Sequence, residues 1–232
     1  MNRMSAIVLA GGLGKRLGRP LPKQLLLLRG KPMLIHTLER LDLLDEIDRI
    51  VMPCPESYLE EIVQTAKNFG IRKEILCIEG GQTRQESVHN ALREISTEYV
   101  LLHESARPFV TVDEFRAIVR SRYENVTYAT PLYFTVLEGN EVITGVLKRE
   151  TLLNIQLPQK FRTDDLRKCH ELARQMNDKF TEDAGMIVKY LGKPVNVLRG
   201  SEINKKITTP LDVKMSEILY DEMLARKRGG VK

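Results

Sequence analysis

A stretch near the N-terminus, AIVLAGGLGKRLGRPLPKQ, combines glycines with cations directly after an apolar run. Gly11, Gly12 and Gly14 have no Cβ, so the backbone N–H groups around them can approach a ligand closely. Arg16 and Lys23 carry charge that can neutralise phosphate oxygens. This combination predicts a site for a phosphorylated ligand. A tight surface turn with solvated cations is the alternative, but such a turn needs neither this much glycine nor this much charge.

The stretch matches neither of two common phosphate-binding motifs. The dinucleotide fingerprint G-x-G-x-x-G, begun at Gly12, would require glycine where the chain has Leu17. A P-loop would require glycine in place of Leu9 and a hydroxyl residue in place of Arg16. The sequence therefore predicts a different kind of phosphate loop.

Two further segments place glycine or charge after an apolar run. In GGQTRQES, Gly80 and Gly81 precede Arg84 and Ser87, and in HESARP, Glu104 lies three residues before an arginine. Mg²⁺ usually takes only one or two protein carboxylates, so Glu104 is a candidate metal or acceptor contact. A solvated glutamate at a strand end, and glycines that only shape a turn, are the alternatives.

Apolar runs and helix-type patterns alternate along most of the chain. The expected strands lie at residues 5–10, 49–54, 74–79, 99–104, 125–132 and 195–200. The expected helices lie at residues 32–44, 56–70, 83–95, 111–123, 163–177, 182–191 and from 210 onwards. Thr111 and Glu114 have the spacing of a capping box. The last helix is expected to pack through Leu211, Met215, Ile218 and Leu219.

Strands that alternate with helices predict an α/β fold with a Rossmann-like, mostly parallel sheet and helices on both faces. Ligands of such folds bind beyond the carboxyl ends of the strands. The three segments above follow Ala10, Glu79 and His103, each at such an end. Residues 131–160 break the alternation and are interpreted as an arm. We therefore expect a single domain, residues 1–232, with a protruding arm.

Composition and charge narrow the class of protein further. No stretch approaches the roughly 20 apolar residues of a membrane span, and the sequence shows no secretory signal. Cys54, Cys77 and Cys169 form neither a zinc pattern nor a disulfide framework, which fits a reducing cytoplasm best. The net charge of +5 is modest, and no basic stripe with interleaved aromatics indicates nucleic-acid binding. A small anionic substrate explains the scattered cations better.

Six segments that are spread over almost the whole chain follow one another in the order typical of a known enzyme family. They are LAGGLGKRLGRPLPKQ, GGQTRQESVHNAL, HESARPFV, LPQKF, TEDAG and INKKITTPLD. Through them the sequence resembles the 2-C-methyl-D-erythritol 4-phosphate cytidylyltransferase family and its ribitol 5-phosphate relatives. The resemblance implies the fold of nucleotide-diphospho-sugar transferases with a dimerisation arm. It also implies a Mg²⁺-dependent homodimer in which the acceptor's phosphate attacks the α-phosphorus of CTP and pyrophosphate leaves.

The resemblance also implies which residues bind the nucleotide. Backbone groups of the first loop would hold the triphosphate, while Arg16 and Lys23 would stabilise charge on the α-phosphate and the leaving pyrophosphate. The loop around residues 80–87 would read the cytosine and ribose. The residues assigned to binding on this side are Ala10, Gly11, Gly12, Gly14, Gly80, Gly81, Arg84 and Ser87.

On the acceptor side, the resemblance implies two cations and a metal ligand. Lys206 would lie near the acceptor's phosphate, and Arg149 would reach from the arm into the partner's site; ordinary surface cations are the alternative. Glu104 would bind the metal, although the family usually has aspartate there. The remaining residues expected to contact substrate are Ser105, Arg107 and Thr135.

Departures from the family pattern concentrate on the acceptor side. Phe134 stands where the family commonly has aspartate, Leu157 where it has threonine, and Gln82 where an acidic residue is frequent. Unpaired acceptor hydroxyls would each cost about 1–3 kcal/mol. The leading expectation is methylerythritol phosphate in isoprenoid precursor synthesis. Ribitol 5-phosphate, another sugar or polyol phosphate, or a phosphonate stays open, as does a nucleotide sensor without turnover.

Overall fold

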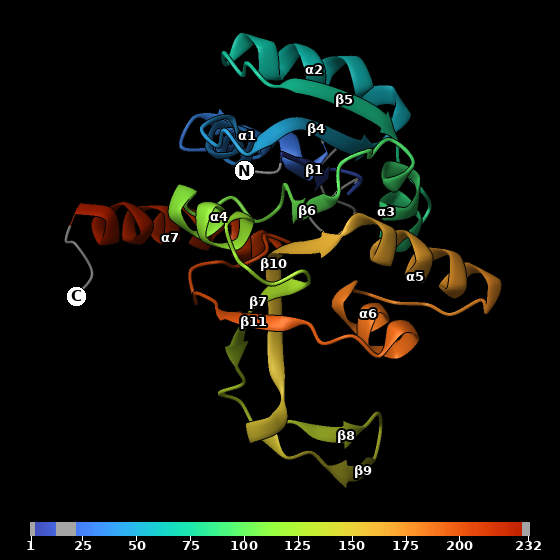
Figure 1. Ribbon diagram of the computed structural model, residues 1–232. Helices are drawn as coiled ribbons and strands as arrows, with labels where there is room; N and C mark the ends of the chain where they lie inside the picture. The colour runs from blue at the N-terminus through green and yellow to red at the C-terminus, as the bar shows by residue number, and fades with distance from the viewer. Residues whose placement is uncertain (1–2, 13–21, 229–232) are drawn as a thin grey trace.

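A seven-stranded sheet forms the centre of the molecule, in the strand order β11-β7-β10-β6-β1-β4-β5 (Figure 1). The computed structural model describes residues 3–12 and 22–228. Neighbouring strands are parallel except β10, which is antiparallel to both β6 and β7. The expected mostly parallel sheet is confirmed. The strands are β1 (Met4–Leu9), β4 (Ile47–Cys54), β5 (Glu74–Glu79), β6 (Tyr99–Glu104), β7 (Val126–Pro131), β10 (Leu153–Arg162) and β11 (Asn196–Arg199).

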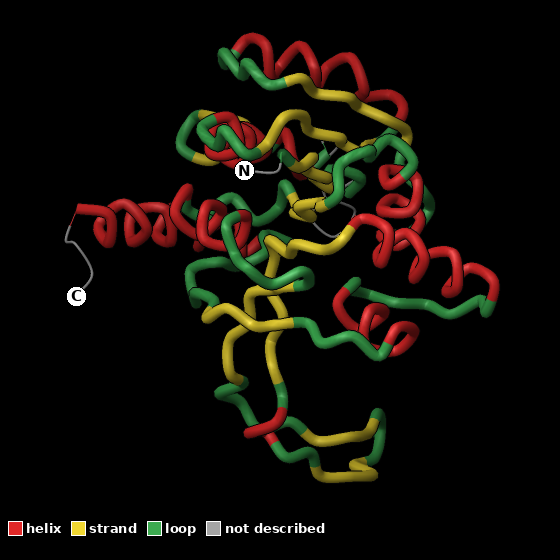
Figure 2. The backbone as a smooth tube through the Cα atoms, in the orientation of Figure 1, coloured by secondary structure: helices red, strands yellow, loops and turns green. Residues whose placement is uncertain are grey.

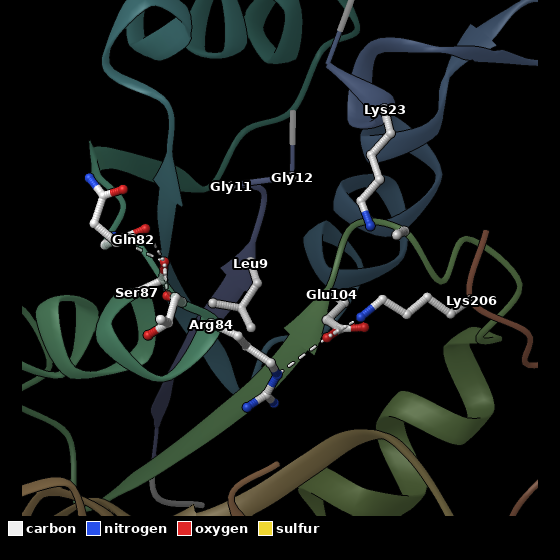
Figure 3. Close-up of a pocket in the computed structure, with 12 residues that line it drawn as sticks. Leu9, Gly11, Gly12, Lys23, Gln82, Arg84, Ser87, Glu104 and Lys206 are labelled. Atoms are coloured by element: carbon white, nitrogen blue, oxygen red, sulfur yellow. Dashed lines mark hydrogen bonds and ion pairs between the residues drawn. The ribbon is translucent and has the colours of Figure 1, made fainter. Parts of the chain in front are cut away.

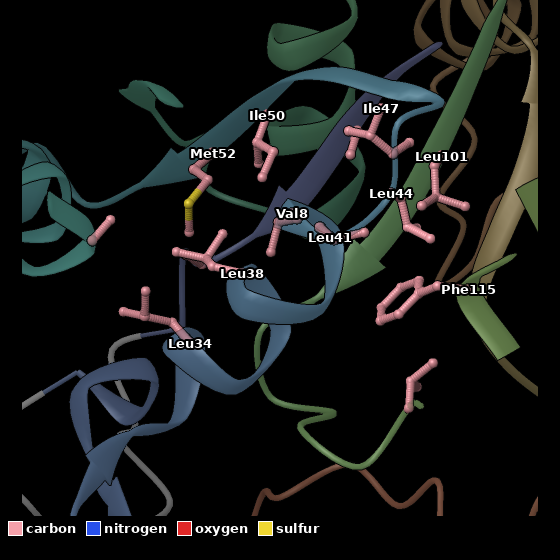
Figure 4. Packing of buried hydrophobic residues seen from close by; sticks show 14 of the residues in the cluster. Val8, Leu34, Leu38, Leu41, Leu44, Ile47, Ile50, Met52, Leu101 and Phe115 are labelled. Carbon is pink, nitrogen blue, oxygen red and sulfur yellow. The ribbon is translucent and has the colours of Figure 1, made fainter. Parts of the chain in front are cut away.

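Helices cover both faces of this sheet, because side chains of the central strands alternate between two apolar cores. In β1, Ala6 and Val8 belong to the core with α1 (Met33–Asp42), α2 (Leu59–Asn68) and α4 (Val112–Val119). Ile7 and Leu9 belong to the core with α3 (Arg84–Leu92), α5 (Thr163–Gln175) and α6 (Ala184–Leu191). Figure 4 shows the first core, where α1 packs over β1 and β4. A strand buried on both faces reads as the continuous apolar run seen in the sequence.

Two helices that follow strands begin with a reciprocal capping box. In α4, the Thr111 side chain accepts from the Glu114 N–H and the Glu114 side chain accepts from the Thr111 N–H, as the sequence predicted. In α3, Thr83 and Glu86 form the same arrangement. This cap fixes the start of α3, and with it the turn that carries the candidate residues after β5.

The arm extends away from the sheet beyond β7 and β10 (Figures 1 and 2). It consists of the antiparallel pair β8 (Leu137–Gly139) and β9 (Ile143–Val146) and the 3₁₀ turn η4 (Arg149–Thr151). The expected range of 131–160 was too long, because β10 returns into the sheet at residue 153. Residues 156–161 are all buried, so their sequence lacks the alternation that marks a half-exposed strand.

The last helix, α7 (Pro210–Arg228), packs through a different side than the sequence predicted. Of the expected residues only Leu219 packs against the third apolar core, and it does so together with Val213, Tyr220 and Met223. Leu211, Met215 and Ile218 are exposed. Apolar residues occur on more than one side of α7, so helical spacing alone could not identify its buried face.

Short elements link the first loop to α1. They are η2 (Lys23–Leu25), β2 (Leu27–Leu28) and β3 (Lys31–Pro32), while η3 (Glu56–Tyr58) precedes α2. No helix within the described residues combines the length and apolar character that crossing a bilayer requires.

Candidate active site

A pocket of about 210 Å³ lies at the carboxyl ends of β1, β5 and β6 (Figure 3). The three segments that the sequence placed at strand ends therefore meet at one edge of the sheet. Strand β1 lies between β4 and β6, so this edge is also the point where the strand order reverses. The residues that line the pocket are Leu9, Gly11, Gly12, Lys23, Gly81, Gln82, Thr83, Arg84, Ser87, Glu104, Ala106 and Lys206.

The first loop brings a backbone segment and an ammonium group together. The Ala10 N–H donates to the Pro53 carbonyl at 3.0 Å, which ties the start of the loop to the neighbouring strand. A Cβ on Gly12 would lie 2.6 Å from Cε of Lys23, so glycine lets the lysine lie against the backbone. Gly14 and Arg16 lie outside the described residues.

The loop after β5 is fixed by its own hydrogen bonds. The Gly81 N–H donates to Ser87 Oγ at 3.0 Å, and that hydroxyl donates to the Thr83 carbonyl at 2.9 Å. A Cβ on Gly81 would lie 2.2 Å from Cβ of Glu86 and 2.9 Å from its carbonyl carbon, so only glycine fits. The Gly80 N–H donates to the Cys54 carbonyl. The loop is thus preformed, and Ser87 is used to shape it.

Glu104, at the end of β6, forms ion pairs with three cationic side chains. Its carboxylate lies 2.9 Å from Lys206 Nζ, 3.3 Å from Arg84 Nε and 3.6 Å from Arg107 Nε. Burial favours a raised pKa for Glu104, but the charges of Lys206 and Arg84 outweigh it and hold the pKa at about 2. Even with Asp183, which pairs with Arg84 from the far side, two carboxylates face three cations, and Lys23 also lines the pocket on the side of Glu104 (Figure 3). Such a pocket suits a polyphosphate.

Two buried residues that sequence reasoning missed extend this cluster. Arg84 Nη1 lies 2.5 Å from an oxygen of Asp183, whose other oxygen lies 2.8 Å from His170 Nε2. Asp183 is ninety-nine residues from Arg84 in the chain, so no local pattern links them. Its segment, TEDAG, was singled out only as part of a family resemblance. Leu9, Gln82, Thr83 and Ala106 were also missed as lining residues.

Four candidates lie beside the pocket without lining it, namely Ala10, Gly80, Ser105 and Arg107. Ser105 is fully buried, and its hydroxyl donates to the Leu9 carbonyl at 2.9 Å, so it joins β6 to β1. Arg107 donates to the Asn204 carbonyl at 2.9 Å and thereby supports the segment that carries Lys206.

The two arm candidates are not brought to the pocket of their own chain. Thr135 is exposed between β7 and β8. Arg149 lies in η4, donates to the Tyr133 carbonyl at 3.3 Å and has a side chain that is 46% exposed. Neither residue lines the pocket.

A metal site at this pocket would rest on Glu104 alone. The described residues hold no group of three or more His, Cys, Asp or Glu side chains that could bind a metal ion. Oε2 of Glu104 is buried and accepts no hydrogen bond from the described part of the chain. Because Mg²⁺ in phosphate sites commonly uses one or two carboxylates together with phosphate oxygens, Glu104 fits such an ion.

No side chain that lines the pocket is arranged as a nucleophile in the described residues. The Thr83 hydroxyl accepts the capping bond of α3, and the Ser87 hydroxyl is bound within its loop. His103, next to Glu104, is fully buried and packs its ring against Phe115 at 4.9 Å. Burial and the nearby Arg107 lower the pKa of His103 to about 3, so it is neutral. The site can therefore act by positioning and charge neutralisation.

An α/β sheet with a preformed, glycine-lined and cation-rich pocket at its switch point is the arrangement expected of a nucleotidyltransferase, an enzyme that must hold the phosphates of a nucleotide. The sequence model of the IspD family, 2-C-methyl-D-erythritol 4-phosphate cytidylyltransferase, matches residues 4–222. A protein of that name from Pelotomaculum thermopropionicum is 36% identical over 226 residues, which cover 94% of each chain. The chain belongs to this family of cytidylyltransferases.

Solved structures support the same fold. 4-Diphosphocytidyl-2C-methyl-D-erythritol synthase from Anaerococcus prevotii superposes with a TM-score of 0.82 at 24% identity, over 95% of this chain and 99% of that one. 2-C-Methyl-D-erythritol 4-phosphate cytidylyltransferase from Thermus thermophilus gives 0.74 at 27% identity, over 94% and 99% of the two chains. The expected fold and family are confirmed.

Proposed function

We propose that this enzyme transfers CMP from CTP to 2-C-methyl-D-erythritol 4-phosphate and releases pyrophosphate, a step of isoprenoid precursor synthesis. Family membership over residues 4–222 supports the reaction. The structural observation that supports this reaction for the present chain is that three features line one pocket. These are the glycine loop with Lys23, the Gly81–Ser87 loop and the Glu104 cation cluster.

In this reaction an oxygen of the acceptor's phosphate forms a bond to the α-phosphorus of CTP, while the bond from that phosphorus to the β-phosphate bridging oxygen breaks. The attacking phosphate is already ionised, so the reaction requires no protein nucleophile and no general base. The protein must instead align the two phosphates and neutralise charge. A pocket with several cations and with its hydroxyls engaged elsewhere is suited to that task.

Each part of the pocket has a proposed role toward CTP. The backbone at Ala10, Gly11 and Gly12 holds the triphosphate, and Lys23 stabilises charge on the α-phosphate and on pyrophosphate. Arg16 is proposed to share that role, and Gly14 to shape the loop. The loop with Gly80, Gly81, Arg84 and Ser87 contacts the cytosine and ribose.

Glu104 is proposed to hold Mg²⁺. When bound there, the ion would neutralise negative charge on the triphosphate. The three cations around Glu104 keep its carboxylate ionised and in place whether or not the ion is present. Ser105 and Arg107 support this end of β6 and the segment with Lys206.

The acceptor side is proposed to be completed by a second copy of the chain. Lys206 binds the acceptor's phosphate from within the pocket, while Arg149 and Thr135 reach the pocket of the partner in a homodimer. The arm carries exposed apolar side chains, which a partner would cover: Tyr133, Phe134, Val142, Ile143 and Val146. We further propose that residues 1–232 form one domain with this arm, and that the enzyme works in the cytoplasm.

Release of pyrophosphate from CTP and Mg²⁺ tests this proposal, measured across methylerythritol phosphate, ribitol phosphate, glycerol phosphate and several phosphonates. Rapid turnover with methylerythritol phosphate is expected. Turnover with only another acceptor would keep the chemistry and change the substrate, and Phe134 and Leu157 would be the residues to examine. Tight CTP binding with no release for any acceptor would contradict the proposal and favour a sensor.

A further inference from the structure

We propose that Asp183 is a positioning residue that fixes Arg84 in the nucleotide pocket, and that His170 in turn orients Asp183. The proposal deepens the function above and rests on it. It concerns a buried row of side chains from α5 to the pocket, in which His170 contacts Asp183, Asp183 contacts Arg84 and Arg84 contacts Glu104. Only the pocket end of this row can meet substrate, so the buried end acts through Arg84.

The protonation of the buried end follows from its contacts. Asp183 and His170 are 0% and 1% exposed. Burial favours a raised pKa for Asp183, but Arg84 and His170 bring it down to about 2, so Asp183 is an anion. His170 Nε2 must therefore carry the hydrogen that faces it, because a lone pair there would repel the carboxylate. Nδ1 of His170 has no hydrogen-bond partner among the described residues, so Asp183 is the one side chain that the ring is seen to contact by hydrogen bonding in the described part of the chain.

Arg84 is held at two edges of its planar guanidinium. Nη1 lies 2.5 Å from Asp183 Oδ2, whereas Nε lies 3.3 Å from Glu104 Oε1, an oxygen that also accepts from Lys206. Asp183 is thus the shorter contact and is not shared with another cation of the pocket. If Asp183 lost its charge, Glu104 would be the one carboxylate left to hold Arg84 among the described residues. Arg84 would then compete with Lys206 for the same oxygen of Glu104.

A second tie joins the same segments. Gln85 Nε2 donates to the Asp178 carbonyl at 3.2 Å, and the Phe180 N–H donates to Gln85 Oε1 at 2.8 Å. Gln85 follows Arg84 in the first turn of α3, and residues 176–183, which include Asp178 and Phe180, connect α5 to α6. The connection thus supports the helix turn that carries Arg84 and Ser87.

The test compares four variants with the wild-type enzyme: Asp183→Asn, His170→Gln, His170→Leu and the double variant of Asp183→Asn with His170→Leu. Steady-state kinetics in CTP and direct binding of CTP are measured, with melting temperature as a check of folding. The control is Glu46→Gln, which weakens the pair of the buried Glu46 carboxylate with the half-exposed Arg120 at the opposite end of the sheet. That variant is expected to lose stability while its kcat/KM stays within about twofold of wild type.

For Asp183→Asn we expect kcat/KM for CTP to fall roughly 10- to 100-fold, mostly through KM, as when an outer partner of a ligand residue is lost. His170→Gln keeps a donor and should stay near wild type, whereas His170→Leu should change KM in the same direction as Asp183→Asn. The double variant should be no worse than Asp183→Asn alone, because His170 acts through Asp183.

Destabilisation of Asp183→Asn with unchanged KM for CTP, as in Glu46→Gln, would overturn the inference. If His170→Gln and His170→Leu changed KM for CTP equally, the proposed role of His170 in orienting Asp183 would be overturned. If Asp183→Asn does not fold, the two His170 variants carry the test. Failure of the proposed function is recognised separately, because the wild-type enzyme would then release no pyrophosphate.

Discussion

The pocket and the arm differ in how firmly their candidate residues are held. In the pocket, Arg84 and Glu104 are anchored by buried ion pairs, and Ser87 is bound within its own loop. On the arm, Arg149 is half-exposed and Phe134 is 80% exposed, and the supporting sheet has only two strands. Within a single chain, the residues proposed to bind the nucleotide are therefore held in place, whereas those of the arm, proposed to bind the acceptor, are exposed to solvent.

This difference has a physical basis. A preformed site spends little ordering entropy on binding, which suits the large, charged nucleotide. An isolated two-stranded hairpin is marginally stable in water and gains from packing against a partner. The two regions can therefore vary independently, and the departures from the family pattern at Phe134 and Leu157 fall on the acceptor side. The predictions below test this division, beginning with the largest effect.

Lys23→Ala should lower kcat by roughly 1000-fold, since it removes a preorganised charge at the reacting phosphate. Binding of CTP should weaken much less. Single-turnover kinetics and calorimetry separate the two quantities. Lys31→Ala, which breaks a surface pair with Glu39, is the matched control and should be near wild type. A kcat within tenfold of wild type would remove Lys23 from the catalytic machinery.

Glu104→Gln should lower kcat/KM by about 100-fold, because three neighbouring cations lose the carboxylate that holds them. It should also raise the Mg²⁺ concentration needed for half-maximal pyrophosphate release. Glu79→Gln, at the exposed end of β5, serves as the control. An unchanged Mg²⁺ dependence would argue against Glu104 as the metal ligand.

Arg149→Ala should raise KM for the acceptor roughly 10- to 30-fold, the value of a charge-assisted contact, and should leave KM for CTP unchanged. Lys148→Ala, one residue away, is the control. Initial rates over a grid of both substrates measure the two constants. Equal changes in KM for CTP and in KM for the acceptor would contradict the division between a pocket that binds the nucleotide and an arm that binds the acceptor.

Val146→Ser should weaken self-association about tenfold, because the side chain is 83% exposed in one chain and would be buried in a dimer. Sedimentation velocity over a range of concentrations measures the change. Ile218→Ser on α7 alters a side chain of similar exposure and should leave association unchanged. The opposite pattern would move the interface from the arm to α7.

The smallest effect concerns acid stability. The folded pKa of Glu104 is about 2, below its ordinary value of 4.5, because Lys206 and Arg84 outweigh burial. Its stabilising contribution is therefore complete above pH 4.5 and is lost as the pH falls toward 2. The free energy of unfolding of Glu104→Gln, measured by urea titration between about pH 5 and pH 2.5, should fall less steeply than that of wild type. If the free energy of unfolding fell equally steeply with pH in the variant and in wild type, the pairing of Glu104 with Lys206 and Arg84 would be contradicted.

Local features of the fold could be predicted from the sequence because each depends on neighbouring residues. The capping box of Thr111 and Glu114 and the apolar run of β1 are examples. The strand ends then gave the position of the pocket, since parallel strands share an edge. The buried face of α7 could not be read, because its apolar residues occupy several sides.

The support of the site was harder to predict than the site itself. Arg84 and Ser87 lie in one short segment with glycines, whereas Asp183 meets Arg84 only through tertiary folding. The extent of the arm was overestimated because β10 is buried on both faces and carries no alternation. Long-range contacts of polar residues leave no periodic trace in a single sequence.

Mixing two inactive or weakened chains tests the central claim most directly. Lys23→Ala and Arg149→Ala enzymes would be mixed, dissociated and reassociated, and pyrophosphate release measured at acceptor concentrations below KM. If each pocket receives Arg149 from the partner, half the dimers regain one intact site, and activity should rise to about a quarter of wild type. Activity that stays at the average of the two parent enzymes would contradict the account, because Arg149 would then act within its own chain or not at all.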